Sequence, residues 1–442
     1  MLRDLHRDFP ADIAARTNRP VAVLGGGVSG GAAARLLEAR GAEAVVYDER
    51  GVGGARMDFG AEQAAAHDLA IYSPGFPQRH PWLAAARRAS VLCVGELDFA
   101  SLFLRPSPIV AVTGTNGKTT LTEFLVFAHK RAGHGAVAAG NIGYPLSSVM
   151  SLKGRTPLVV CEVSSFQAED LRHFSPATLL WTNFAEDHLD RHGTLDAYFR
   201  AKYRLIERLD TTGGARLYVG ESVAAAATGF GLPLPAFTKV VARAEVAGKI
   251  PAGSAFCTAA QQENYALARR YWLDTREQPE SALEEAARTF TLPRHRLAKT
   301  GDAAGVAFWN DSKGTNFHAA LAALDSVAAT LPAGGSLHWL GGGLSKGGDL
   351  KKFAAAVAGR VRSAALIGET AGALRPLLAD AGVSVEVFDK LPAAVRGAAA
   401  RAVAGDAVVF SPAFASFDMF KDYADRGLAF ERTVRDIVRK AR

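Results

Sequence analysis

The segment Gly114-Thr-Asn-Gly-Lys-Thr-Thr120 constrains the fold of this chain more than any other. A β-branched, apolar run at residues 109–112 precedes it, and a segment with apolar residues at helical spacing, 121–128, follows it. That order is typical of a strand, a phosphate loop and a helix, because glycines let backbone N–H groups turn inward and the helix N-terminus adds partial positive charge. Lys118 would supply a cation to the β- and γ-phosphates, and the Thr119 hydroxyl suits Mg²⁺. The sequence therefore predicts the use of a nucleoside triphosphate.

This loop departs from the commonest phosphate-loop pattern at one position, because Val112 stands where the first glycine would be. Only Gly114 and Gly117 therefore frame the turn. An ordinary glycine-rich turn with a surface lysine is the alternative interpretation. The position of Gly117-Lys118-Thr119 between a predicted strand and a predicted helix favours the phosphate loop.

The composition is that of a globular protein with more than one domain. The 442 residues are 49% hydrophobic and 21% charged, and this length suggests two or three domains. No apolar run is long enough to cross a bilayer, and the charged segment 1–10 is not typical of a signal peptide. Three cysteines are few and odd in number, and Cys93 and Cys161 lie in apolar runs. We therefore expect buried, reduced thiols in a cytoplasmic enzyme.

The net charge of +7 makes a nucleic-acid partner one class to weigh. The basic residues are scattered, however, and no run of lysine and arginine with interleaved aromatic residues is present. We favour pockets for anionic small molecules over a merely basic surface. We expect a monomer with neither a nucleic-acid nor a membrane partner.

Strand-like apolar runs alternate with helical segments along almost the whole chain, which predicts α/β domains with parallel sheets covered by helices. We expect three domains: a Rossmann-like N-terminal domain (1–105), a central P-loop mononucleotide-binding domain with a parallel sheet (106–296) and a Rossmann-like C-terminal domain (297–442). The first boundary falls where residues 104–108 break regular structure. The predicted strands are 21–24, 44–47, 69–72, 158–163, 178–183, 306–309, 337–340, 364–367, 383–388 and 407–410, and predicted helices include 32–40 and 391–404.

A second glycine-rich turn, Gly25-x-Gly27-x-x-Gly30, follows the first predicted strand and opens a helix. The N–H groups of Val28 and Ser29 could hold a pyrophosphate there, and Asp48 could accept a hydrogen bond from a sugar hydroxyl or a base. Any nucleotide with a diphosphate could use this turn, so a dinucleotide cofactor is only one interpretation. A tight turn with a capping aspartate is the other.

Polar residues gather where predicted strands of the central domain end. Glu162 would emerge at the carboxyl edge of the sheet, where a hard carboxylate suits Mg²⁺. His188 lies in a carboxylate-rich turn, residues 183–190, which favours a ligand or catalytic group over a structural histidine. Lys202 lies on a predicted helix, and nothing local distinguishes it.

The C-terminal domain carries three comparable segments after predicted strands. They are residues 310–316, the glycine-rich 341–349 with a central lysine, and 411–420. Any one of them could be only a turn. Three at the carboxyl ends of one sheet favour substrate handling.

Together these motifs resemble those of the Mur ligase family of peptidoglycan synthesis, over nearly the whole chain. Within that family, residues 310–316 and 411–418 are similar to the branch that adds D-glutamate. The motifs that carry the resemblance are Gly114-Thr-Asn-Gly-Lys-Thr119, Gly140-Asn-Ile-Gly143, Glu162-Val-Ser-Ser-Phe-Gln167, Asn183-Phe-Ala-Glu-Asp-His-Leu-Asp190, Asn310-Asp-Ser-Lys-Gly-Thr-Asn316 and Ser411-Pro-Ala-Phe-Ala-Ser-Phe-Asp418.

The resemblance implies a role for each matching residue. Two Mg²⁺ ions would be held by Thr119, Glu162, His188 and Lys202, the last as a carbamylated lysine. The catalytic residues would be Lys118, His188 and Lys202. ATP would contact Gly114, Thr115, Asn116, Gly117, Lys118, Thr119, Thr120, Asn264, Arg296, Asp311 and Lys313. The UDP-sugar substrate would contact Val28, Ser29, Asp48 and Asn141, and D-glutamate would contact Thr315, Lys346, Ser416 and Tyr423.

The implied reaction is ATP-dependent amide ligation. The γ-phosphoryl group would move to the alanyl carboxylate of UDP-N-acetylmuramoyl-L-alanine, and the amine of D-glutamate would then displace phosphate. The chain departs from the family's usual patterns at Ser345, at Ala298 and in Ala260-Gln-Gln-Glu-Asn264. The alternatives are the same chemistry with another amino acid such as L-glutamate or with a folate substrate, a P-loop regulatory or transport ATPase, and an NAD-dependent oxidoreductase.

Overall fold

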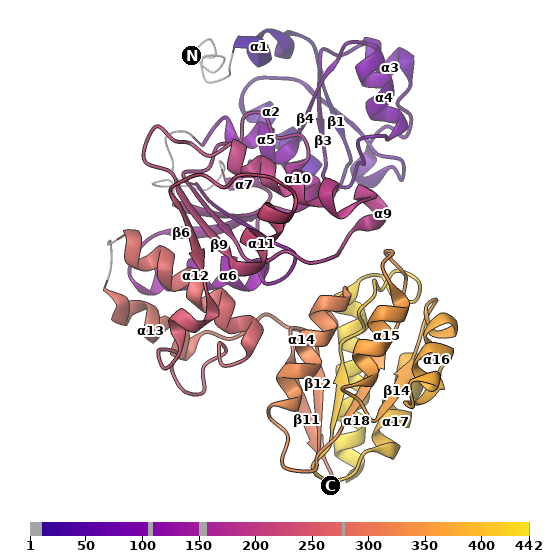
Figure 1. The fold of residues 1–442 in the computed structure, drawn as a ribbon. Coiled ribbons are helices and arrows are strands. Elements are labelled where there is room, and N and C mark those ends of the chain that lie inside the picture. The colour runs from indigo at the N-terminus through magenta and orange to yellow at the C-terminus, as the bar shows by residue number, and fades with distance from the viewer. Residues whose placement is uncertain (1–10, 105–108, 150–156, 276–278, 442) are drawn as a thin grey trace. The chain divides into compact units, whose positions relative to one another are not determined.

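The computed structural model describes residues 11–104, 109–149, 157–275 and 279–441, which form three α/β sheets with their helices (Figure 1). The described residues fall into two compact units. The first lies within Met1–Phe184, Asp196–Pro251 and Glu263–Thr289, and the second within Ala185–Leu195, Ala252–Gln262 and Phe290–Arg442. The predicted boundary at 104–108 and the charged segment 1–10 lie almost wholly outside the described residues.

The N-terminal sheet has four parallel strands in the order β2-β1-β3-β4. Its strands are β1 (Val21–Leu24), β2 (Ala44–Tyr47), β3 (Leu69–Tyr72) and β4 (Leu92–Gly95). Its helices are α1 (Ala11–Ala14), α2 (Val28–Ala39), α3 (Ala61–Ala65), α4 (Pro81–Arg88) and α5 (Glu96–Ser101). Every residue of β1 and β3 is buried, as expected for central strands of a sheet covered on both faces.

The central sheet has six parallel strands in the order β10-β9-β8-β5-β7-β6. Its strands are β5 (Ile109–Thr113), β6 (Ala136–Gly140), β7 (Leu158–Glu162), β8 (Thr178–Trp181), β9 (Arg216–Gly220) and β10 (Thr238–Val241). The helices in this stretch of the chain are α6 (Lys118–Arg131), α7 (Leu146–Val149), α8 (Ser165–Ala168), α9 (Leu189–His192), α10 (Leu195–Glu207), α11 (Glu221–Gly229), α12 (Ala259–Thr275) and α13 (Glu280–Thr289). Of these, α9 and the start of α12 belong to the second unit. Since β5 lies between β7 and β8, the loops that follow these three strands meet at one edge.

The C-terminal sheet has the order β11-β12-β16-β13-β14-β15, with only β11 antiparallel. Its strands are β11 (Ala298–Ala303), β12 (Val306–Asn310), β13 (Leu337–Gly341), β14 (Ser363–Leu366), β15 (Ser384–Val387) and β16 (Ala407–Phe410). Its helices are α14 (Phe317–Ala328), α15 (Leu350–Ala358), α16 (Ala371–Asp380), α17 (Leu391–Arg401) and α18 (Tyr423–Ala441).

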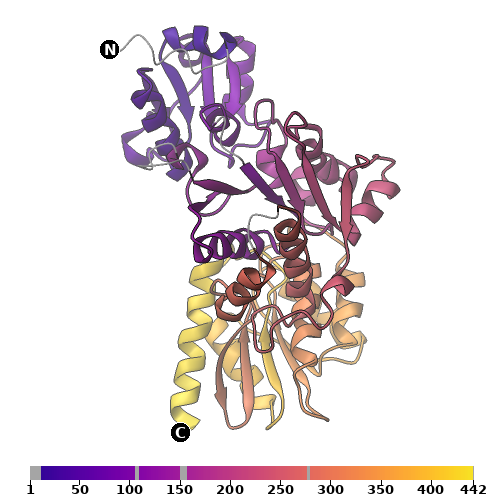
Figure 2. The same ribbon diagram turned by 90° about the vertical axis from the view of Figure 1, so that its left-hand side faces the viewer.

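Alternate side chains of the C-terminal strands enter two separate cores. Trp339 and Val409 pack with α14, α15 and α16 on one face, whereas Val408 and Phe410 pack with α17 and α18 on the other. Figure 2 shows α18, in yellow, running along this sheet. Both faces are therefore covered, and the loops at the strand ends remain available for a site.

Within the first unit, one hydrophobic core continues from the N-terminal sheet into the central sheet. Two buried carboxylates on the short helix α5 accept hydrogen bonds from backbone N–H groups of the central region. Glu96 accepts a hydrogen bond from the Ser147 N–H at 2.8 Å, and Asp98 accepts bonds from three successive N–H groups at residues 172–174. Burial raises the pKa of Glu96, although the bonds from Ser147 oppose the rise.

The structure confirms the predicted fold class, and most predicted strands match within one or two residues. Helix α2 begins at Val28, four residues earlier than predicted, because the glycine-rich turn itself supplies its first turn. Cys161 is buried as expected, but Cys93 is only half-buried because it lies on the edge strand β4. The division into three domains stays a prediction.

We predict that Gly30→Ala is strongly destabilising, because a methyl group there would lie 1.7 Å from the carbonyl oxygen of Gly25. The expected loss in unfolding free energy is on the order of 3 kcal/mol. Gly27→Ala is the matched control, since a Cβ there meets nothing within 4 Å, and it should cost less than about 1 kcal/mol. Urea unfolding of the two variants measures the difference, and equal midpoints would contradict the packing argument.

Candidate active site

The phosphate loop joins β5 to α6, as the sequence predicts. Gly114 has a φ of +147° and Gly117 a φ of +82°, and residues with a Cβ atom rarely adopt such positive φ values. A Cβ on Gly114 would lie 1.8 Å from Thr182 Oγ1, and one on Gly117 would lie 2.4 Å from Asn264 Oδ1. Both positions therefore require glycine for backbone conformation and for space.

The end of β8 holds this loop from the neighbouring strand. The Asn183 carbonyl accepts the Thr115 N–H at 3.0 Å, and its side-chain oxygen accepts the Asn116 N–H at 2.9 Å. The Thr182 hydroxyl donates to the Asn116 carbonyl at 2.6 Å. Sequence analysis placed Asn183 in a polar cluster and missed this function, because the contact depends on the pairing of β5 with β8.

Two lysines converge on one carbonyl of the loop. Lys118 Nζ donates to the carbonyls of Gly114 and Thr115, each at 2.9 Å. Lys202, buried on α10, donates from Nζ to the Gly114 carbonyl at 3.0 Å and to Thr113 Oγ1 at 3.3 Å. The structure therefore brings together two residues that lie 84 positions apart in the chain, and it places Lys202 where no local sequence pattern could.

A buried carboxylate at the end of β7 can hold a metal ion. Glu162 is 1% exposed, and its Oε1 accepts a hydrogen bond from Asn141 Nδ2 at 2.7 Å. Among the described residues, no group bonds its buried Oε2. A buried anionic oxygen without a partner is costly, so the carboxylate fits a cation.

The rest of the donor set also suits Mg²⁺. No three His, Cys, Asp or Glu side chains among the described residues gather into a metal cluster. Mg²⁺ commonly takes one or two carboxylates and completes its shell with phosphate oxygens and water. Glu162 and the mostly buried Thr119 hydroxyl in the first turn of α6 match that preference.

The Asp48 carboxylate holds the N-terminal glycine turn through backbone hydrogen bonds. Asp48 accepts the Gly26 N–H at 2.8 Å and the Arg50 N–H at 2.9 Å. Burial raises its pKa, but backbone N–H groups outweigh that effect and hold the pKa below its usual range. Asp48 therefore braces the turn, while Val28 at the helix start is 77% exposed and Ser29 is half-buried. The role of these residues toward a UDP-sugar stays a prediction.

In the second unit, Lys346, one of the residues predicted to hold the amino acid, pairs with Asp187. Lys346 Nζ lies 2.9 Å from Asp187 Oδ1 and 3.5 Å from Thr315 Oγ1. Asn316 Nδ2 donates to Asp187 Oδ2 at 3.0 Å, and His188 Nε2 lies 3.6 Å from that oxygen. Burial opposes ionisation of Asp187, yet Lys346 and His188 hold its pKa down to about 2. Sequence analysis did not assign Asp187 this central place.

Residues of the C-terminal domain that are predicted to bind the nucleotide lie beside one that is predicted to bind the amino acid. Asp311 Oδ2 accepts the Ser411 hydroxyl at 2.7 Å, and Oδ1 accepts the Leu297 N–H at 3.1 Å. The Lys313 ammonium lies 4.1 Å from the centre of the Tyr423 ring, a cation–π contact. Residues 310–316, 411–418 and the start of α18 therefore form one constellation.

The remaining predicted residues divide between the two units. Asn264 and Asn141 lie in the first unit, with the phosphate loop, Glu162 and Lys202. Arg296 lies in the second, in the turn before β11, and Ser416 follows β16, where it is buried. His188 also belongs to the second unit.

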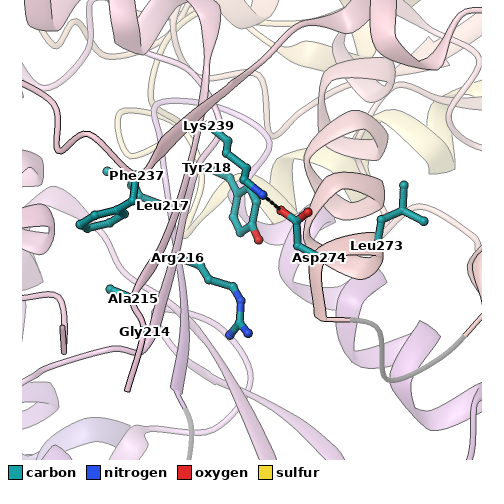
Figure 3. Close-up of a pocket in the computed structure, with 9 residues that line it drawn as sticks. All are labelled: Gly214, Ala215, Arg216, Leu217, Tyr218, Phe237, Lys239, Leu273 and Asp274. Carbon is teal, nitrogen blue, oxygen red and sulfur yellow. Dashed lines mark hydrogen bonds and ion pairs between the residues drawn. The ribbon is translucent and has the colours of Figure 1, made fainter. Parts of the chain in front are cut away.

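A pocket of about 460 Å³ lies beside strands β9 and β10 of the central sheet, near the residue at which β9 begins (Figure 3). It adjoins Arg216, the first residue of β9, and an ion pair in which Lys239 Nζ lies 2.6 Å from Asp274 Oδ2. Tyr218 points toward that pair. None of the predicted site residues lines this pocket, so it is separate from the candidate active site.

The fold and the loop define an α/β protein with three sheets, of which the central, parallel one carries a phosphate loop. Two family descriptions match the sequence: Mur ligase middle domain at residues 112–226, and Mur ligase, glutamate ligase domain at residues 295–414.

Curated relatives match along nearly the whole chain. UDP-N-acetylmuramoylalanine--D-glutamate ligase of Desulfotalea psychrophila is 35% identical over 448 residues, covering 93% of this chain and 95% of the relative. The protein of that name from Frankia casuarinae is 37% identical over 451 residues, covering 94% of each. This chain belongs to the Mur ligase family.

Solved structures share the fold. UDP-N-acetylmuramate-alanine ligase MurC from Thermotoga maritima has a TM-score of 0.59 at 16% identity, covering 95% of this chain and 99% of that one. MurF ligase from the same organism, in complex with ADP, has a TM-score of 0.56 at 15% identity, covering 84% and 96%. No helix among the described residues is long and apolar enough to cross a bilayer.

We predict a pH-dependent contribution from Asp311. Burial raises its pKa to about 7, although the Ser411 hydrogen bond and the charges of Arg296 and Arg426 oppose the rise. Protonated Asp311 should therefore contribute stability that is fully present below about pH 4, the usual value in an unfolded chain, and lost as pH rises through 7.

The test compares the unfolding free energies of the wild type and Asp311→Asn from pH 4 to pH 8. The wild type should lose stability relative to the variant across this range, because only the wild type must ionise a buried group. Parallel curves would show that Asp311 ionises as it does in water.

Proposed function

We propose that this chain is an ATP-dependent amide ligase that adds D-glutamate to UDP-N-acetylmuramoyl-L-alanine in cytoplasmic peptidoglycan precursor synthesis. Curated relatives named as that ligase, 30–37% identical over nearly the full length, support the substrates. The observation that carries the chemistry is the phosphate loop, on which Lys118 and Lys202 converge, and whose strand β5 pairs with the strand that ends at Glu162.

The chemistry begins with activation of a carboxylate, which is a poor acyl donor. A bond forms between the γ-phosphorus of ATP and an alanyl carboxylate oxygen, while the bond to the leaving ADP oxygen breaks. The amine of D-glutamate then attacks the acyl carbon, phosphate leaves with the bonding pair, and the nitrogen loses a proton.

This chain's residues would act mainly through charge and position. Lys118 would neutralise charge that develops on the transferring group, and the loop N–H groups would orient it. Glu162 and Thr119 would hold Mg²⁺, which would offset phosphate charge. Asn264, Arg296, Asp311 and Lys313 are the further nucleotide contacts that we propose.

We also propose the three-domain division stated above, with the UDP-sugar held by the N-terminal domain and D-glutamate by the C-terminal domain. Val28, Ser29, Asp48 and Asn141 would contact the sugar nucleotide. Thr315, Lys346, Ser416 and Tyr423 would contact D-glutamate, whose two carboxylates suit the lysine and the hydroxyl donors.

Phosphate release from ATP tests the function directly. With UDP-N-acetylmuramoyl-L-alanine present, D-glutamate should stimulate release, and L-glutamate or other amino acids should not. Lys118→Ala should lower this rate by at least about 100-fold. Release that responds to L-glutamate would indicate the alternative amino acid, and release without any acceptor would indicate an ATPase.

Lys202 is a candidate for carbamylation, which would convert its ammonium into an anion and a metal ligand. Lys202→Ala should lose activity by about 100-fold and regain part of it when short carboxylates are added, since these replace the anion. Lys130→Ala, at an exposed lysine on α6, is the control and should keep full activity. Full activity of untreated Lys202→Ala would exclude a catalytic role.

A further inference from the structure

The first turn of α18 carries a buried arginine that the sequence analysis did not single out. Arg426 is 1% exposed, and its guanidinium donates four hydrogen bonds to neutral acceptors. Nε bonds Ser312 Oγ at 3.1 Å, and Nη2 bonds the Ser312 carbonyl at 2.9 Å and the Phe414 carbonyl at 3.1 Å. Nη1 bonds the Ala415 carbonyl at 3.2 Å.

These bonds tie together two loops that carry predicted substrate contacts. Ser312 lies between Asp311 and Lys313, three residues before Thr315. The carbonyls of Phe414 and Ala415 immediately precede Ser416. The Arg426 side chain therefore sets the spacing between two loops. Residues 310–316 carry predicted contacts to the nucleotide and to the amino acid, and residues 411–418 carry a predicted contact to the amino acid.

The same guanidinium also abuts the loop that carries Lys346. Gly343 has a φ of +142°, and a Cβ there would lie 3.2 Å from Arg426 Nη1 and 2.3 Å from the Ala415 carbonyl. Leu344 and Ala415 exchange backbone hydrogen bonds at 2.9 and 3.0 Å. Arg426 thus lies where the loops after β12, β13 and β16 meet.

Burying a charged side chain whose hydrogen-bond acceptors are all neutral is expensive, even with the Asp311 and Asp418 carboxyl groups nearby, so the arrangement needs a reason beyond packing. A guanidinium presents several donors in a rigid plane, which fixes both the distance and the direction of its acceptors. A lysine could bond only part of this set, because its donors radiate from one atom. The geometry is therefore specific to arginine.

We infer that Arg426 is a positioning residue that holds Thr315, Lys346 and Ser416 in register to bind the acidic amino acid, an inference that rests on the proposed function. It touches no reacting atom. Its effect should appear in the KM for the amino acid and, through Asp311 and Lys313, more weakly in the KM for ATP. The KM for the UDP-sugar should stay constant, because the residues predicted to bind it belong to the first unit.

The experiment compares Arg426→Lys and Arg426→Met with Arg435→Met, a change at an exposed arginine on the same helix. Steady-state assays with the full chain give kcat and separate KM values for D-glutamate, ATP and UDP-N-acetylmuramoyl-L-alanine. For both Arg426 variants the KM for D-glutamate should rise by on the order of tenfold to 100-fold, as expected for lost bonds to a charged donor. Arg435→Met should behave as the wild type.

Hydrogen exchange gives a readout that does not depend on substrates. The N–H groups of Leu344 and Ala415 should exchange faster in Arg426→Lys than in the wild type, while the phosphate-loop helix α6 is unchanged. If Arg426→Met does not fold, Ser312→Ala removes the acceptor of Nε and should raise the same KM in the same direction.

Two results would overturn the inference. One is a folded Arg426→Lys with wild-type KM for D-glutamate and wild-type exchange at Leu344 and Ala415. The other is a fall in kcat with all three KM values unchanged, which a lower fraction of folded enzyme would produce. A wild-type protein that shows no ligation with D-glutamate would instead refute the proposed function. Hydrogen exchange at Leu344 and Ala415 would still test whether Arg426 holds the loops in position.

Discussion

The site of the first unit depends on the parallel pairing of β5 with β7 and β8. That pairing brings three strand ends to one edge, where Thr182 and Asn183 can bond the loop that follows β5. The loop can lie this close only because Gly114 and Gly117 have no side chains. The strand register and the two glycines therefore depend on each other, because a side chain at Gly114 or Gly117 would collide with Thr182 or Asn264.

Charge follows from this geometry. Two ammonium groups approach the Gly114 carbonyl, and the buried Glu162 carboxylate lies at the end of the adjoining strand β7. The second unit repeats the pattern with other groups, since Asp187 and Lys346 pair beside Thr315, and Arg426 fixes the loops around them. In each unit, buried polar contacts fix the positions of the residues that we propose to bind anionic ligands.

The sequence predicted the fold well where apolar runs are strong. Strands such as β1, β8 and β16 are buried on both faces and read as continuous apolar segments. The predicted strands did not include β4, β9 or β10. They also did not include β6, whose alanines are typical of a helix, or β11, whose polar residues form an antiparallel edge. Neither strand has a periodic signal, because pairing with a neighbour stabilises it more than its own composition does.

The site was predictable only in part, for a related reason. Glycines, Lys118 and Glu162 stand beside strand ends, so local pattern finds them. Lys202 came only from family resemblance, and Arg426 looks in sequence like an ordinary helix arginine. Lys202 lies 88 residues from Gly114, and Arg426 lies 114 residues from Ser312, so only the tertiary fold reveals these two contacts.

The proposed function requires that the glycine-framed loop, residues 114–120, binds a triphosphate. A crystal structure of the protein with a non-hydrolysable ATP analogue and Mg²⁺ tests it most directly. We expect the triphosphate to lie against the amides of residues 115–119 and Lys118, with the metal ion at Glu162. A structure with the analogue bound elsewhere, and neither Lys118 nor Glu162 in contact with it, would contradict the account.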